Sequence, residues 1–194
     1  KHQTTLTRMR DAIELGRDLA EGTRPLVQTV LGGGQWDEAK SMFRDRVGDW
    51  ARLAKQHEAT IAIKPHRFGA MSTPEQAAWL IDQLGNPPDL RIVYDFSHYA
   101  FRDLSIEDTI QQARRLVGYV AMKDAIQSGD KVSFALPGES GSQDHRAIRK
   151  SLLAAGYSGD YCCEVSSQVS QQTGYDPIAA AKICHRNLAP LFGE

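Results

Sequence analysis

Apolar positions along the chain alternate between two spacings, one typical of helices and one typical of buried strands. Side chains that recur every three or four residues predict six helices, at 6–20, 37–57, 73–85, 105–116, 143–155 and 176–191. Short runs of aliphatic residues lie between them and predict five strands, at 26–31, 60–64, 90–94, 118–122 and 160–165. This alternation predicts an α/β fold in which parallel strands are joined by crossover helices.

Residues that favour helix starts and turns support these boundaries. Thr73 precedes Pro74 and stands three residues before Gln76, which is the pattern of a capping box. Ser105 and Asp108 have the same spacing at the next helix. The polar, glycine-rich stretch 127–142 is predicted to be a loop.

Two architectures fit the alternation, an open doubly wound sheet and a closed (β/α)8 barrel. Neither G-x-G-x-x-G nor G-x-x-x-x-G-K-S/T is present, so we expect no nucleotide cofactor. Ionisable residues follow four consecutive strands, at 64–67, 95–98, 123–124 and 164. A barrel builds its site from the loops after several strands, whereas an open sheet concentrates it at one switch point. We therefore predict a (β/α)8 TIM barrel.

The length suggests that only part of such a barrel is present. A complete (β/α)8 domain has about 250 residues, whereas the chain has 194 and starts in a predicted helix. We expect residues 1–194 to form a single domain of about five βα units, with the first three strands of the barrel missing. Open parallel edges are unfavourable, so we expect either a longer native protein or a homo-oligomer.

The composition of the chain limits which partners and which cellular compartment can be expected. The 23 basic and 24 acidic side chains nearly cancel, so nothing points to nucleic acid or to an anionic membrane surface. No apolar run approaches the roughly 18 residues of a membrane span. The three cysteines, of which Cys162 and Cys163 are expected to be buried packing residues, cannot form a disulfide framework. We expect a cytoplasmic protein.

Several short segments at the strand ends resemble the xylose isomerase-like TIM barrel superfamily, which includes sugar isomerases and epimerases and endonuclease IV-type proteins. They are Ile61-Ala62-Ile63-Lys64-Pro65-His66, Asp95-x-x-His98, Met122-Lys123-Asp124, Pro137-Gly138-Glu139, and Gly156-Tyr157-Ser158-Gly159 leading into Glu164-Val165-Ser166. Each segment alone is weak, but the ordered set spans residue 29 to the C-terminus and is fairly specific. The resemblance implies that Glu164 lies on the final strand of the barrel.

The resemblance also implies a divalent metal (Mn, Mg or Zn), which ketose epimerases of this family hold through Glu, Asp, His and Glu on the last four strands. Asp95 and Glu164 match the Asp and the final Glu. Lys64 stands in place of the first Glu, and Ala121 stands in place of the His. Hard divalent cations prefer several oxygen ligands, and an ammonium nearby repels them. We therefore expect the family's metal site to be degraded.

Two hypotheses for the chemistry remain open. In the first, Lys64 occupies the place of the metal, faces Asp95 and Glu164, and acts as acid, base or Schiff-base former. Glu164 then moves the proton next to the substrate's carbonyl, so Lys64 and Glu164 are the candidate catalytic residues. In the second, a metal still binds through His66, Asp95, His98 and Glu164 in a rearranged shell.

Four further residues are candidates for binding the substrate, namely His66, Arg67, His98 and Lys123. Arg67 and Lys123 suit hydroxyl, carboxylate or phosphate groups. The resulting hypothesis is a sugar isomerase- or epimerase-like enzyme of carbohydrate metabolism, or a lyase, acting by proton transfer next to a carbonyl on a small carbohydrate or keto-sugar. The alternative is a non-catalytic carbohydrate-binding or regulatory barrel that has lost the metal site.

Overall fold

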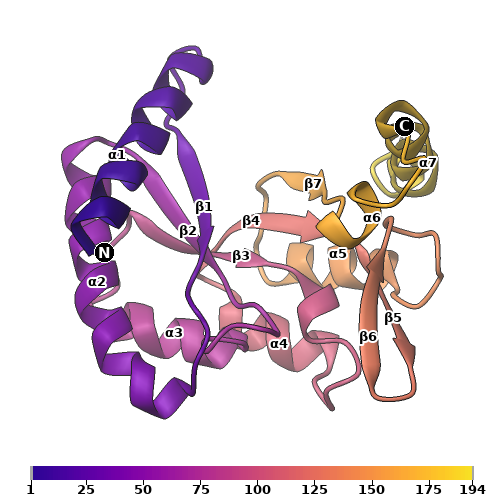
Figure 1. The fold of residues 1–194 in the computed structure, drawn as a ribbon, viewed down its shortest axis with the longest axis horizontal. Coiled ribbons are helices and arrows are strands. Elements are labelled where there is room, and N and C mark those ends of the chain that lie inside the picture. The colour runs from indigo at the N-terminus through magenta and orange to yellow at the C-terminus, as the bar shows by residue number, and fades with distance from the viewer. Residues whose placement is uncertain (1, 194) are drawn as a thin grey trace. The chain divides into compact units, whose positions relative to one another are not determined.

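The computed structural model describes residues 2–193, with the helices and strands labelled in Figure 1. The helices are α1 (His2–Leu19), α2 (Trp36–Gln56), α3 (Pro74–Asp82), α4 (Ile106–Ala113), α5 (His145–Ala154), α6 (Ser167–Ser170) and α7 (Pro177–Leu188), with single 3₁₀ turns η1 (Phe96–His98) and η2 (Ala189–Leu191). The strands are β1 (Leu26–Val30), β2 (Thr60–Lys64), β3 (Leu90–Tyr94), β4 (Val117–Met122), β5 (Asp124–Ser128), β6 (Lys131–Ala135) and β7 (Tyr161–Cys163). No helix in this range is both long enough and apolar enough to cross a membrane.

Five of the strands form a parallel half-barrel sheet in the order β1-β2-β3-β4-β7. They correspond to the five strands expected from the sequence, which confirms the α/β prediction. The chain divides into two compact units, and the expectation of a single domain stays a prediction. Unit 1 contains Lys1–Val93 and Leu116–Tyr119, and unit 2 contains Tyr94–Arg115 and Val120–Glu194.

Unit 1 is held together by strands that are buried on both faces. Each residue of β2 pairs in parallel register with β1, from Leu26 with Thr60 to Val30 with Lys64. Four of the five β2 residues are buried, because helices cover a parallel sheet and leave its strands little contact with water. Helix α3 begins with the expected capping box, in which Thr73 and Gln76 satisfy each other's backbone N–H groups.

Unit 2 contains the ends of β3 and β4 and the whole of β7. Strand β4 pairs with β7 in parallel, with Val120 opposite Tyr161 and Met122 opposite Cys163. Helix α4 is capped by Ser105, whose hydroxyl accepts a hydrogen bond from the Asp108 N–H at 2.9 Å, as the spacing predicted. The ends of β4 and β7 therefore have a fixed register relative to each other.

The prediction of a loop at 127–142 is wrong for its first half. Strands β5 and β6 form an antiparallel hairpin whose last pair is Ser128 with Lys131. Gly129, with φ of +58°, takes the first position of the two-residue turn, where type II′ turns favour glycine. Val132 and Phe134 lie on one face of β6 and pack against Ala100 and Ala125. The polar composition of this stretch obscured the alternation of apolar and polar residues that is typical of a strand.

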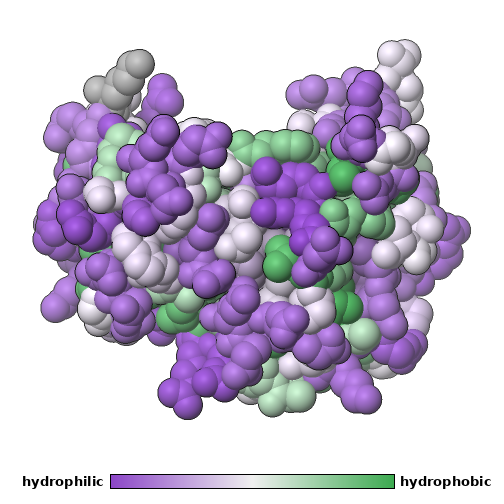
Figure 2. All heavy atoms as spheres, turned by 90° about the horizontal axis from the view of Figure 1, so that it is seen from below, coloured by the Kyte–Doolittle hydropathy of each residue, from purple (hydrophilic) through white to green (hydrophobic). Residues whose placement is uncertain are grey.

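The expectation of buried cysteines at 162 and 163 is also wrong. Cys162 is half-buried and Cys163 is exposed. Strand β7 is the last strand of the sheet order, so within residues 2–193 nothing pairs with its outer side. On the face drawn in Figure 2, apolar side chains lie among hydrophilic ones.

Candidate functional site

Four of the residues singled out from the sequence meet in unit 2, where β3, β4 and β7 end. They are Asp95, His98, Lys123 and Glu164, and we call them the Lys123 cluster. Asp95 and Lys123 each come directly after the last residue of their strand, and Glu164 directly follows β7. Since the strands run parallel, their carboxyl ends lie at the same edge of the sheet. The parallel arrangement of the strands therefore places these side chains near one another.

Asp95 and His98 are placed by the single turn η1. Asp95 caps this turn, because its Oδ1 accepts hydrogen bonds from the N–H of Ser97 at 3.1 Å and from its hydroxyl at 2.6 Å. Three residues per turn bring His98 back to the side of Asp95, and His98 Nε2 lies 3.4 Å from Asp95 Oδ2. Both side chains are fully buried.

The ammonium of Lys123 lies at the centre of the cluster. Its Nζ is 2.5 Å from Glu164 Oε1, 3.3 Å from Asp95 Oδ2 and 3.2 Å from His98 Nε2. A lysine ammonium has three N–H donors and no acceptor, so these three acceptors match its donors in number. Only 3% of the Lys123 side chain is exposed, and burial of a charge is tolerated when it is paired in this way.

Glu164 is the member of the cluster that solvent can reach. Its backbone N–H donates to the carbonyl of Met122 at 2.9 Å, which continues the β4–β7 register and holds Glu164 beside Lys123. Its side chain is 29% exposed, whereas the side chain of Asp95 is completely buried. A molecule approaching the cluster therefore meets the carboxylate of Glu164 first.

Phe134 is a part of the site that the sequence did not reveal. The centre of its ring lies 4.4 Å from Lys123 Nζ and 5.1 Å from the centre of the His98 ring. A ring face next to an ammonium gives a favourable cation–π contact and keeps water away from the charge. The signal that could have found it is the alternation of Val132 and Phe134 after the Gly129 turn.

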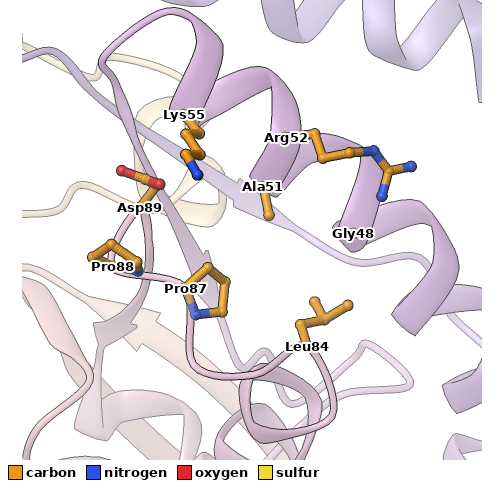
Figure 3. Close-up of a pocket in the computed structure, with 8 residues that line it drawn as sticks. All are labelled: Gly48, Ala51, Arg52, Lys55, Leu84, Pro87, Pro88 and Asp89. Atoms are coloured by element: carbon orange, nitrogen blue, oxygen red, sulfur yellow. The ribbon is translucent and has the colours of Figure 1, made fainter.

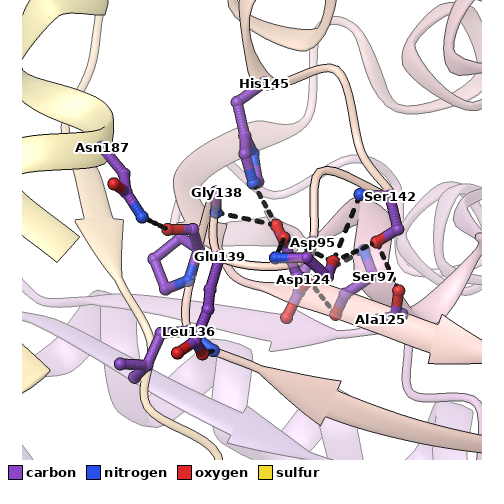
Figure 4. A network of polar contacts seen from close by, with 12 residues as sticks. Asp95, Ser97, Asp124, Ala125, Leu136, Gly138, Glu139, Ser142, His145 and Asn187 are labelled. Carbon is purple, nitrogen blue, oxygen red and sulfur yellow. Dashed lines mark hydrogen bonds and ion pairs between the residues drawn. The ribbon is translucent and has the colours of Figure 1, made fainter. Parts of the chain in front are cut away.

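The residue after Lys123 anchors the loop that follows the hairpin. Asp124 is fully buried and accepts hydrogen bonds from the N–H of Gly138 at 2.9 Å and from the N–H and hydroxyl of Ser140 at 2.9 and 2.7 Å. His145 Nε2 lies 2.6 Å from its Oδ1. Figure 4 shows Gly138 and His145 pointing toward Asp124.

These contacts set the ionisation of Asp124. Burial by itself raises the pKa of this carboxyl, but the hydrogen bonds from His145, Ser140 and Gly138 outweigh burial and lower the pKa below its ordinary value. Asp124 is therefore a carboxylate at neutral pH. We assign it the role of holding the loop beside Lys123.

The other predicted site residues lie in unit 1, at the end of β2. Lys64 is its last residue and is 5% exposed. His66 is half-buried, and its Nδ1 accepts a hydrogen bond from the N–H of Phe68 at 3.3 Å. Arg67 follows it and is also half-buried. The catalytic role of Lys64 and the substrate-binding roles of His66 and Arg67 stay predictions.

A separate cavity of about 380 Å³ lies in unit 1, lined by Gly48, Ala51, Arg52, Lys55, Leu84, Pro87, Pro88 and Asp89. Figure 3 shows it between the second half of α2 and the loop that leads into β3. This is the amino end of the strand, whereas barrels of this type build their chemistry at the carboxyl ends. We therefore place the candidate site at the Lys123 cluster.

The donor set of the cluster does not fit a divalent metal. Asp95, His98 and Glu164 are all residue types that bind metals, but they converge on the ammonium of Lys123. A metal at the same point would have to displace this positive charge or be repelled by it. Ala121, buried on β4, adds no donor, and no metal-holding group of three or more His, Cys, Asp or Glu exists within residues 2–193.

Comparison with known proteins gives one family match. The profile of a family described as "Xylose isomerase-like TIM barrel" matches residues 1–182. No curated protein matches the chain.

Several solved structures share the fold. An Escherichia coli protein, 3-keto-D-glucoside 4-epimerase YcjR, is 18% identical, with a TM-score of 0.61 over 87% of this chain. A xylose isomerase-like TIM barrel protein from Mycobacterium smegmatis in complex with magnesium is 18% identical, with a TM-score of 0.72 over 98%. The IolI protein with a zinc atom is 18% identical, with a TM-score of 0.75 over 98%.

This chain is shorter than those proteins. It spans 63% of the epimerase, 66% of the magnesium-bound protein and 69% of IolI. At 18% identity the similarity shows a common fold, and it does not carry over an activity or a metal. The observed sheet is thus part of a barrel of this type, as the sequence predicted.

Proposed function

The chain belongs to the xylose isomerase-like TIM barrel family, and from this premise we propose that it is an enzyme of the sugar isomerase and epimerase type. The family includes such enzymes, and the epimerase described above has a similar fold. The proposed substrate is a small carbohydrate or keto-sugar that has a carbonyl group. The proposed reaction is proton transfer at the carbon next to that carbonyl.

The observation that carries the proposal is the partly exposed Glu164 carboxylate beside the buried Lys123 ammonium. The carboxylate takes the proton from the carbon next to the carbonyl, and the electron pair of the broken C–H bond forms the double bond of an enediolate. The ammonium lies close enough to Glu164 to stabilise the negative charge that develops on the carbonyl oxygen. Protonation of the same carbon on its opposite face gives the epimer. Protonation of the former carbonyl carbon, with the proton of the neighbouring hydroxyl passing to the enediolate oxygen, gives the isomer.

The remaining predicted residues take supporting roles in this proposal. Lys64 is a second acid–base group, and His66 and Arg67, which follow it in unit 1, bind hydroxyl or anionic groups of the substrate. His98 and Asp95 hold the ammonium of Lys123 in place, as their distances to its Nζ indicate.

The test is proton exchange between substrate and solvent. Wild-type protein is incubated in D₂O with a panel of ketoses, keto-sugars and sugar phosphates, and deuterium incorporation next to the carbonyl is followed by NMR. We expect Glu164→Gln to slow exchange by about 10²–10⁴-fold, as for the loss of a general base. Lys64→Met is expected to lower the rate as well, and turnover unchanged in this variant would remove Lys64 from the mechanism.

The control for these variants is Glu107→Gln, which changes an exposed carboxylate in the first turn of α4. Its exchange rate should equal that of the wild type. Circular dichroism establishes that all variants are folded. Exchange by Glu164→Gln at the wild-type rate would contradict the proposal.

One observation favours a second candidate function, a carbohydrate-binding barrel without turnover. The three donors of Lys123 already have acceptors inside the protein, which is also the arrangement of a structural ion-pair cluster. Calorimetric binding of a sugar by wild-type protein, with no deuterium exchange on the whole panel, would support this candidate.

A further inference from the structure

The environment of Lys123 resembles a cation site that the protein fills with its own side chain. Two carboxylate oxygens and one imidazole nitrogen lie between 2.5 and 3.3 Å from a single point, which is the ammonium nitrogen. The Phe134 ring closes a further side at 4.4 Å. Oxygen and imidazole ligands lie about 2.0–2.3 Å from Zn or Mn, so the three side chains stand at the longer distances that suit an ammonium.

The ammonium and a metal exclude each other at this point. Asp95 Oδ1 accepts the hydrogen bond from the Ser97 hydroxyl, and its Oδ2 is the oxygen that lies near the Lys123 ammonium. The two positions at which the family resemblance implies further ligands carry Lys64 and Ala121, and neither contributes a donor for a divalent cation. The ammonium of Lys123 thus pairs with the Asp95 carboxylate, a fully buried charge that is costly to leave unpaired.

We infer that Lys123 takes the place of the divalent cation and that the site works without a metal. This inference deepens the proposed function and rests on it for the reaction. Glu164 turns from Lys123 toward the substrate, and the freed N–H of Lys123 donates to the carbonyl oxygen, which becomes its third acceptor. Glu164 is suited to this exchange because its side chain is 29% exposed, while Asp95 and His98 are fully buried.

The first test is metal binding, which does not depend on turnover. Mn²⁺ binding is measured by calorimetry and electron paramagnetic resonance on wild type, Lys123→Met and Lys123→Arg. We expect no binding below millimolar Mn²⁺ for the wild type and for Lys123→Arg, which keeps the charge. Lys123→Met should gain affinity by roughly 10–100-fold, the range by which groups around a metal site alter its affinity.

The matched control is Lys131→Met, which removes an exposed lysine from β6 and should behave like the wild type. Circular dichroism establishes that each variant is folded. Micromolar Mn²⁺ binding by wild-type protein would overturn the inference. A folded Lys123→Met protein with no gain in Mn²⁺ affinity would overturn it too.

The second test separates this inference from the proposed function. Deuterium exchange by wild-type protein should be unchanged by EDTA and by added Mn²⁺. Exchange that EDTA abolishes and Mn²⁺ restores would overturn the inference and leave the proposed function intact. If no substrate exchanges at all, the proposed function fails, and the metal-binding result still decides whether Lys123 fills a cation site.

Discussion

Single residues of unit 2 contribute to the site through their hydrogen bonds as much as through their own chemistry. Asp124 is the clearest case, because four hydrogen bonds from Gly138, Ser140 and His145 converge on its buried carboxylate. Hydrogen bonds to a buried charged group are individually worth about 1.5–3 kcal/mol. The loop at 138–142 therefore depends on the charge of one side chain.

This dependence predicts a loss of stability in acid. The folded pKa of Asp124 is lower than its ordinary value of 3.8, so the carboxylate stabilises the folded state above about pH 4, and this contribution is lost as the pH falls through the folded pKa. Asp124→Asn should lower the free energy of unfolding by about 2 kcal/mol at pH 7. The difference from wild type should shrink as the pH approaches 3.

Urea unfolding at pH 7 and at pH 3 checks this expectation. Asp130→Asn, in the exposed hairpin turn, is the control and should change the free energy of unfolding by less than about 0.5 kcal/mol. An equal effect of Asp124→Asn at both pH values would show that the charge of Asp124 does not matter.

At the same scale, the sequence predicted the members of the cluster but not their arrangement. Asp95, Lys123 and Glu164 could be found because each directly follows an apolar strand, and His98 because it comes three residues after Asp95. The sequence favoured Lys64 as the ammonium between the two carboxylates, whereas in unit 2 it is Lys123 that contacts both of them. A position directly after a strand predicts at which edge of the sheet a residue lies. Which side chains it contacts there depends on its rotamer and on the register of the strands.

At the scale of elements, the strands could be predicted and the hairpin could not. The strands of the parallel sheet are continuous apolar runs, because both of their faces are covered. Strands β5 and β6 bury one face only, and their polar side chains gave the stretch the composition of a loop. Phe134 was missed for this reason, although it contacts Lys123 directly.

The close approach of β3 and β4 in unit 1 gives a prediction about an element. A Cβ added at Gly118 would lie 2.5 Å from the Cβ of Arg91, which is closer than real Cβ contacts. The Ile92 N–H donates to the carbonyl of Leu116 at 2.7 Å, so the strands cannot separate without losing this bond. We expect Gly118→Ala to destabilise the protein by about 1–3 kcal/mol.

Thermal unfolding of the two alanine variants Gly118→Ala and Gly33→Ala tests this packing. Gly33 has no atom within 4 Å of an added Cβ, so its variant should unfold at the wild-type temperature. If Gly118→Ala is as stable as Gly33→Ala, the spacing of β3 and β4 described above is wrong.

At the scale of the whole molecule, the parallel sheet ends in two strands that pair on one side only. The order β1-β2-β3-β4-β7 leaves β1 and β7 at its ends within residues 2–193. Val30 and Leu26 on β1 are 51% and 38% exposed. Open strands with exposed apolar side chains favour pairing with further strands, in line with the expectation from the sequence of either a longer native protein or a homo-oligomer.

We predict that the chain self-associates through β1. Sedimentation velocity from micromolar to several hundred micromolar protein should show a sedimentation coefficient that rises with concentration. Val30→Lys should weaken this rise, because a charge on an edge strand opposes pairing. Ile178→Lys, which changes an exposed apolar side chain on α7, should not. A monomer at every concentration would contradict the prediction.

The anchoring of Asp124 bears on how readily the molecule receives a ligand. Segment 138–142 and helix α5, through His145, are already tied to the residue after Lys123. The conformational entropy of this segment is thus lost during folding, before any ligand arrives. A sugar that binds beside Glu164 would not have to order this segment, so binding would cost less conformational entropy. The region around Lys123 and Glu164 is therefore preorganised, and more of the free energy of each contact contributes to affinity.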